Sequence, residues 1–174
     1  MKILVKQIIK KMIGFLFLLC WLNYSFGQDD RKIDVLFSPG IIYQQNLFLD
    51  ANLLIGELTI VPRKIPIIGV EGWRIGVESN LRSETNFAIA PKIGYEYSMT
   101  FFSFRCSALN YFQNGNSEFR LLPEIGFSMG GWANLNYGYG ISFNDGDLIN
   151  VGKHRVSLSF NLNRKLRKAV WKRY

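Results

Sequence analysis

Polar and apolar residues alternate along this chain in five segments between residues 86 and 163. In residues 133 to 144, every other position is apolar or aromatic, and the positions between carry only glycine, serine and asparagine. A period of two indicates β-strands, because successive side chains of a strand point to opposite faces of the sheet. A soluble sheet usually places Lys, Glu and Thr in water, so small polar residues favour the narrow, wet interior of a membrane barrel.

Eight segments are predicted as strands, and most have the roughly ten to twelve residues that a tilted strand needs to cross a bilayer. Pro39 predicts a bulge or break in the first, because proline has no N–H for the ladder, and residues 70 to 72 predict a bulge in the third. The register of the second stays open, since apolar and polar residues share one of its faces. The predicted strands are 33–44, 47–58, 67–79, 86–97, 102–108, 118–129, 133–144 and 155–162.

The connections between these strands differ in length. Barrels of the bacterial outer membrane have short periplasmic turns and longer outer loops. With a periplasmic N-terminus, the tight turns are expected at 98–100 and 130–132, and the long outer connections at 80–85, 113–117 and 144–152. Two connections depart from this rule: the outer link near Asn46 is very short, and the inner link 59–66 is long.

The first 27 residues are typical of a secretory signal peptide, with four lysines before an apolar stretch too short to span a bilayer as a helix. Cleavage is expected before Gln28. We therefore predict three parts: a signal peptide at 1–27, a barrel at 28–163 and a basic tail at 164–174. The exported chain then keeps Cys106 alone and cannot form an internal disulfide.

The formal charge of +8 is unevenly distributed. Four basic residues leave with the signal peptide and six lie in the last eleven positions, so residues 28 to 163 hold eleven basic and thirteen acidic residues. That balance leaves no basic face for nucleic acid. The tail is predicted to be a solvated extension; contact with anionic lipid headgroups or with a periplasmic partner is the alternative.

The pattern of the whole mature chain resembles the small eight-stranded outer-membrane barrels of Gram-negative bacteria, which include OmpX-like and OmpA-like transmembrane domains. The resemblance implies an all-β, eight-stranded, antiparallel up-and-down transmembrane barrel, embedded in outer-membrane lipid and expected to be a monomer. One feature departs from that family. Such barrels commonly end on a strand that closes with an aromatic residue, whereas here Phe160 is followed by the basic tail.

Charged residues fall on the face predicted to point inward. The lumen of an eight-stranded barrel is just wide enough for side chains to fill it, so these residues are predicted to form an ion-pair network that plugs the barrel. A gated conduit, in which one arginine changes its carboxylate partner, is the functional alternative. The predicted interior residues are Asp34, Asp50, Arg74, Glu78, Lys92, Glu96, Arg105, Glu118, Arg120, Glu124 and Arg155.

No motif for a cofactor, a metal or a catalytic nucleophile is present, so we predict no enzyme activity and no cofactor. His154 lies on the lipid-facing register, as the catalytic histidine of a lipid A deacylase barrel does, but the His-x-Ser spacing of that family is missing because Val156 stands in place of the serine. The leading hypothesis is a structural or docking element of the envelope. The alternatives are a lipid-modifying enzyme, an accessory of secretion or surface assembly, and a soluble lipocalin-like barrel with its apolar face inward.

Overall fold

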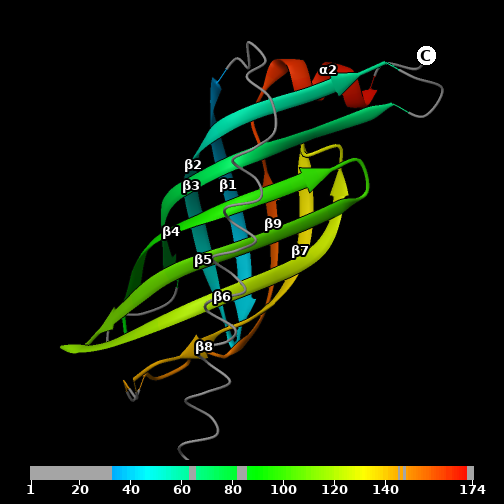
Figure 1. The fold of residues 1–174 in the computed structure, drawn as a ribbon. Coiled ribbons are helices and arrows are strands. Elements are labelled where there is room, and N and C mark those ends of the chain that lie inside the picture. Colours follow the sequence, from blue (N-terminus) through cyan, green and yellow to red (C-terminus); the bar gives the residue numbers. More distant parts are fainter. Residues whose placement is uncertain (1–32, 63–65, 82–85, 145, 147, 172–174) are drawn as a thin grey trace, which may run out of the picture. The chain divides into compact units, whose positions relative to one another are not determined.

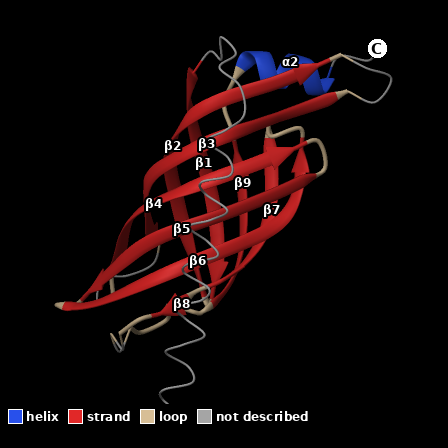
Figure 2. Ribbon diagram, in the orientation of Figure 1, coloured by secondary structure: helices blue, strands red, loops and turns tan. Residues whose placement is uncertain are grey.

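The computed structural model describes residues 33–62, 66–81, 86–144, 146 and 148–171. The predicted signal peptide lies outside these residues. Nine strands and one helix make up the described part (Figure 2). They are β1 (Ile33–Gln44), β2 (Asn46–Val61), β3 (Ile67–Asn80), β4 (Ala88–Met99), β5 (Phe102–Gln113), β6 (Asn116–Met129), β7 (Ala133–Tyr139), β8 (Ile141–Ser142), β9 (His154–Phe160) and α2 (Arg164–Trp171).

The strands form a closed antiparallel barrel of eight strands with one short additional strand, β8. Each of β1 to β6 pairs with the next strand in the chain, and β7 pairs with β9. β9 then pairs with β1 and closes the sheet (Figure 1). The predicted all-β, eight-stranded antiparallel barrel is therefore confirmed as a fold. Closure satisfies the backbone groups that would otherwise be exposed at two sheet edges.

We call the end where β1 begins and α2 lies the helix end, and the end where β1 meets β2 at residues 44 to 46 the loop end (Figure 1). The two tight turns predicted at 98–100 and 130–132 lie at the helix end, where they join β4 to β5 and β6 to β7, and in the second Gly130 and Gly131 have positive φ. The connection predicted to be long at 113–117 is instead a two-residue hairpin turn. Asn114 and Gly115 both have positive φ there, as a type I′ turn requires.

The two irregularities predicted from proline and glycine have different outcomes. Pairing of β1 with β9 is interrupted at Pro39 and resumes where Phe37 faces Leu162, which is the break that a missing N–H produces. The bulge predicted at residues 70 to 72 is wrong, because β2 and β3 pair without interruption. Gly72 faces Gly56, and a Cβ on either would clash with the other strand, so these glycines permit close backbone approach.

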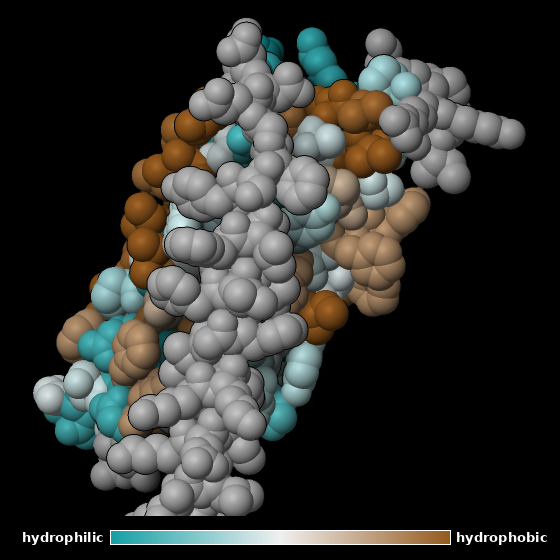
Figure 3. All heavy atoms as spheres, viewed as in Figure 1, coloured by the Kyte–Doolittle hydropathy of each residue, from teal (hydrophilic) through white to brown (hydrophobic). Residues whose placement is uncertain are grey.

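Apolar side chains cover the outer surface of the barrel. Alternate residues of each long strand are exposed and apolar or aromatic, including Trp73 and Tyr95, whose rings pack edge to face at 5.6 Å. Figure 3 shows apolar residues along the visible flank and hydrophilic ones gathered toward the loop end. The lipocalin-like alternative, with the apolar face inward, is therefore wrong. Among the described residues, no helix has the length and apolar character needed to cross a membrane.

The barrel interior is layered. On β2, two buried apolar side chains, Phe48 and Leu54, flank Asp50 and Asn52 on the same inward face, which resolves the register left open by the sequence. Phe48 belongs to an apolar cluster toward the loop end, with Ile42, Ala88, Ala90, Leu109, Tyr111, Leu122 and Val151. Leu54 belongs to a second cluster at the helix end, with Leu36, Ile68, Val70, Leu166 and Ala169.

The C-terminal tail is not the solvated extension that its charge predicted. Residues 164 to 171 form α2, and its side chains Leu166 and Ala169 are buried in the apolar cluster at the helix end. The Asn163 side chain caps the helix by accepting the backbone N–H of Lys165 at 2.7 Å and that of Leu166 at 3.3 Å. Apolar residues recur three and four positions apart in this segment, which is the pattern of an amphipathic helix. The prediction considered only the basic residues and missed this pattern.

We predict that Leu166→Ala lowers the free energy of unfolding by about 2 to 4 kcal/mol, since a fully buried leucine is replaced by a cavity. Urea titration of the folded protein in neutral detergent measures the change. Lys168→Ala, on the exposed side of the same helix, is the control and is expected to change stability by less than about 0.5 kcal/mol. Equal losses in the two variants would contradict the docking of α2.

Candidate functional site

The charged layer of the lumen is the candidate site. Inward-facing positions of six strands supply it, because alternate residues of each strand point to the barrel axis. In the part of the chain that the structure describes, ten charged residues are buried, five acidic and five basic, so their formal charges cancel. They are Asp50, Glu78, Glu96, Glu118 and Glu124, with Arg74, Lys92, Arg105, Arg120 and Arg155.

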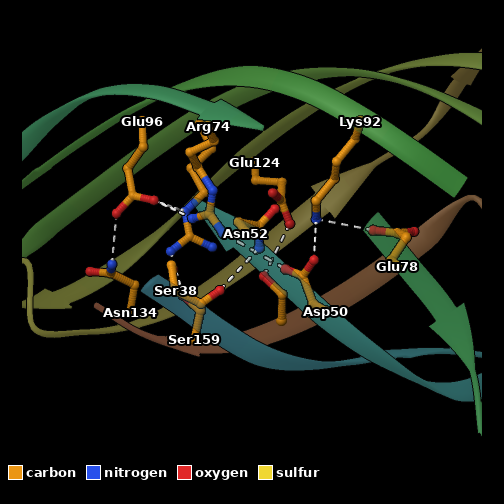
Figure 4. Close-up of polar contacts among 12 residues, drawn as sticks. Ser38, Asp50, Asn52, Arg74, Glu78, Lys92, Glu96, Glu124, Asn134 and Ser159 are labelled. Carbon is orange, nitrogen blue, oxygen red and sulfur yellow. Dashed lines mark hydrogen bonds and ion pairs between the residues drawn. The ribbon is translucent and has the colours of Figure 1, made fainter. Parts of the chain in front are cut away.

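Glu96 is the centre of one half of this layer (Figure 4). Its carboxylate pairs with the guanidinium of Arg74 and lies 3.0 Å from Nε of Arg105. The side chain is fully buried, so both ion pairs are shielded from solvent. Three neutral donors complete its coordination: the Ser98 hydroxyl at 2.8 Å, the Asn134 amide at 2.9 Å and the Asn161 amide at 3.0 Å.

A chain of ion pairs runs from this centre toward the loop end. Arg74 also lies 3.7 Å from Asp50, whose other oxygen is 2.6 Å from Nζ of Lys92. Lys92 donates to Glu78 at 3.2 Å, and Glu78 in turn accepts Arg155 at 2.9 Å (Figure 4 labels the first four of these residues). Each charge therefore touches a charge of opposite sign, and the line of contacts crosses the lumen.

Two further carboxylates finish the layer. Glu124 lies 3.6 Å from Nε of Arg155. Glu118 accepts Nε of Arg120 at 2.7 Å, and Arg120 also donates to the backbone carbonyls of Val151 and Gly152 at 3.2 and 2.8 Å. Arg120 thus ties the connection before β9 to the interior and helps to hold the loop end closed.

Asp34 is the one predicted interior residue that the structure places elsewhere. It lies at the helix end, where its side chain is 28% exposed and 3.3 Å from Nζ of Lys165 on α2. Its position near the start of β1 explains the difference, because the strand has not yet entered the lumen there. The residue links the helix to the barrel wall at the surface and takes no part in the buried network.

Tyr111 is an interior residue that the sequence argument missed. Its hydroxyl donates to Glu78 and accepts the Gln44 amide at 2.7 Å, and the Arg120 guanidinium lies 5.0 Å from its ring centre. The predicted strand stopped at residue 108, whereas β5 continues to Gln113. The sequence could have predicted this position, because residues an even number of positions apart on a strand point to the same face. Tyr111 lies six positions after Arg105 and therefore shares its inward face.

The surroundings of His154 do not assemble a hydrolytic site. His154 is exposed on the outer wall, with Nδ1 2.5 Å from the Tyr137 hydroxyl and its ring 4.9 Å from that of Tyr139. Ser157, the nearest serine in sequence, faces the lumen and donates to Glu124 at 3.0 Å. The described residues also contain no group of three or more potential ligands able to hold a metal ion.

The arrangement of charged side chains in the lumen forms buried ion pairs. Removing one partner of a buried ion pair is costly because the remaining charge is left uncompensated. An ion that crossed the barrel would have to break such pairs and pass both apolar clusters.

No protein-family model, curated protein or solved structure matches this chain.

Proposed function

We propose that this protein is an outer-membrane β-barrel with a plugged interior, which serves the cell envelope as a structural or docking element and carries no enzyme activity. The observation that supports the proposal most strongly is the sidedness of the barrel. Its exposed surface is apolar around the circumference, while its buried interior holds five acidic and five basic residues. Acyl chains are the environment that suits an apolar outer wall, and neutralised charges suit a narrow lumen.

The dimensions of the strands support the same proposal. β1 to β6 have twelve to sixteen residues each, which exceeds the roughly nine to eleven that a tilted strand needs to span the hydrocarbon layer. Exposed aromatic side chains lie toward both ends, with Tyr43, Phe112 and Phe143 near the loop end and Tyr97 and Phe102 near the helix end. Aromatic rings favour the two lipid–water boundaries.

The side chains that fill the lumen support a structural or docking role. Arg74 lies between Glu96 and Asp50, which is the geometry that a gating arginine would need. The apolar clusters on both sides of the charged layer favour a permanent plug instead, because a change of partner by Arg74 leaves those clusters in place.

We predict that the purified protein, reconstituted in a planar lipid bilayer, shows no porin-like conductance. Truncation before Arg164, which removes α2, is expected to leave the barrel closed, because the ion-pair network does not include the helix. Single-channel recording measures both, with a general porin as the positive control. Steady conductance of the intact protein at the level of that porin would contradict the plugged lumen.

Membrane insertion has its own test. Cell fractionation should place the protein with the outer membrane, and liposome flotation should carry the refolded protein to the top of a density gradient. A monodisperse, folded protein in aqueous buffer without detergent would contradict the proposal, since the exposed apolar wall would then be in water.

A further inference from the structure

The outer side of α2 forms a basic surface with an apolar hollow beside it. Arg164, Arg167 and Lys168 are exposed on the helix, and among the described residues none of them has a carboxylate partner. Lys165 differs, because it pairs with Asp34. From Arg164 to Arg173 the sequence has six basic residues and no acidic one. Three positive charges therefore remain available at this end of the barrel.

A hollow of about 320 Å³ lies against this surface, lined by Trp132, Leu162, Asn163, Arg164 and Arg167. Its apolar side is continuous with the outer wall of the barrel: Leu162 is 54% exposed, and the Trp132 ring packs on Phe160 of β9 at 5.6 Å. The polar residues of its lining are Asn163, Arg164 and Arg167. A ligand that fits both sides carries a negative charge next to an apolar chain.

A second hollow of similar size adjoins the first and is lined by Arg167, Lys168 and Trp171. Trp171 is 63% exposed and packs edge to face on Trp132 at 6.1 Å, so the two tryptophans join the hollows. Arg167 lines both. Tryptophan prefers the boundary between headgroups and acyl chains, and arginine forms charge-assisted hydrogen bonds with phosphate oxygens.

We propose that α2 and Trp132 form a binding site for the headgroup of an anionic glycerophospholipid. Arg164, Arg167 and Lys168 contact the phosphodiester, while the acyl chains lie on Trp132, Leu162 and Trp171. The positive charge of the helix accounts for the anionic headgroup, and the apolar hollow beside it accounts for the acyl chains. This inference rests on the proposed function in one respect: if the barrel is inserted in a membrane, the lipid comes from the leaflet that meets the helix end.

The experiment uses the mature chain, folded in neutral detergent, with Trp73→Phe so that emission comes from Trp132 and Trp171. Phosphatidylglycerol and phosphatidylcholine with brominated acyl chains are titrated separately into the micelles. Bromine quenches tryptophan at short range, so the lipid fraction that gives half-maximal quenching reports affinity at this site. We expect phosphatidylglycerol to quench at a fraction at least tenfold lower, since each basic residue near a lipid surface contributes roughly 1 kcal/mol.

The variant Arg164→Gln/Arg167→Gln should lose roughly tenfold to thirtyfold in affinity for phosphatidylglycerol and keep its affinity for phosphatidylcholine. Lys153→Gln/Lys165→Gln is the matched control. It removes two exposed positive charges as well, one at the loop end and one that pairs with Asp34. This control should keep the full preference. Equal quenching by the two lipids, or an unchanged preference in the arginine variant, would overturn the proposal.

Two competitors separate a lipid from other anions. Inorganic phosphate and a polyglutamate peptide, added at the phosphate concentration of the lipid, are expected to leave the quenching in place. Displacement by either would overturn a lipid site, in favour of a free anion or of an acidic protein segment. Flotation tests the proposed function separately: a protein that fails to float but prefers phosphatidylglycerol in micelles refutes membrane insertion alone, and one that floats without that preference refutes this inference alone.

Discussion

Replacing Glu96 by alanine is expected to lower the free energy of unfolding by about 3 to 5 kcal/mol, because two buried guanidinium groups lose their shared carboxylate. Arg74 would keep only Asp50 at 3.7 Å, and Arg105 would keep the Ser159 hydroxyl at 2.5 Å. The loss should be visible as a lower urea midpoint, followed by tryptophan fluorescence in detergent or lipid vesicles.

Two variants test whether the cost comes from the buried charges. Glu96→Gln keeps an oxygen for the amides of Asn134 and Asn161 but no charge, and should lie between alanine and the native residue. Asp34→Ala removes a carboxylate from a largely exposed pair and should cost less than about 1 kcal/mol. If Asp34→Ala and Glu96→Ala were equally destabilising, the central role of Glu96 would be refuted.

Gly126→Ala is expected to keep most of the protein from folding. A Cβ at this position of β6 would lie 1.9 Å from the backbone carbonyl oxygen of Leu135 and 2.6 Å from the Cα of Asn136, both on β7. Backbone atoms cannot move aside without separating the strands, so the cost should exceed the roughly 1 to 3 kcal/mol usual for overpacking. Electrophoresis without heating separates the folded barrel from the unfolded chain and measures the yield.

Gly140→Ala is the matched control, because it adds the same methyl group at a site that can accommodate it. The nearest atom to its Cβ is the Cδ of the Arg120 side chain at 3.1 Å, and the next is the Lys153 carbonyl oxygen at 3.6 Å. A side chain can shift by a few tenths of an ångström, so nearly native folding is expected. Similar yields for the two alanine variants would show that β6 and β7 tolerate separation.

The strands were largely predictable because their signal is local. Alternation shows which face a residue lies on wherever a strand runs regularly, and each of the eight predicted segments overlaps a strand, although several bounds differ. A prediction failed where the same local sequence feature is compatible with two different structures. Glycine in a strand marks either a bulge or a close approach of backbones, and only the pairing of Gly56 with Gly72 decides between them. For the tail, the basic residues hid the apolar face that Leu166 and Ala169 bury.

The charged residues of the lumen illustrate the same division. Parity alone predicted eleven inward charged residues, and ten of them are buried in the structure, but parity could not assign their partners. Glu78 and Arg155 are 77 positions apart and meet only because the barrel closes with a particular register between its strands.

The sequence by itself thus determined the strands and the side to which each residue points, since both depend on neighbours one or two positions away. Tertiary structure alone decided which opposite charges meet, where the two apolar clusters lie in the interior, and that α2 packs at one end. These arrangements depend on contacts between residues far apart in the chain, and closure of the sheet sets the distances between them.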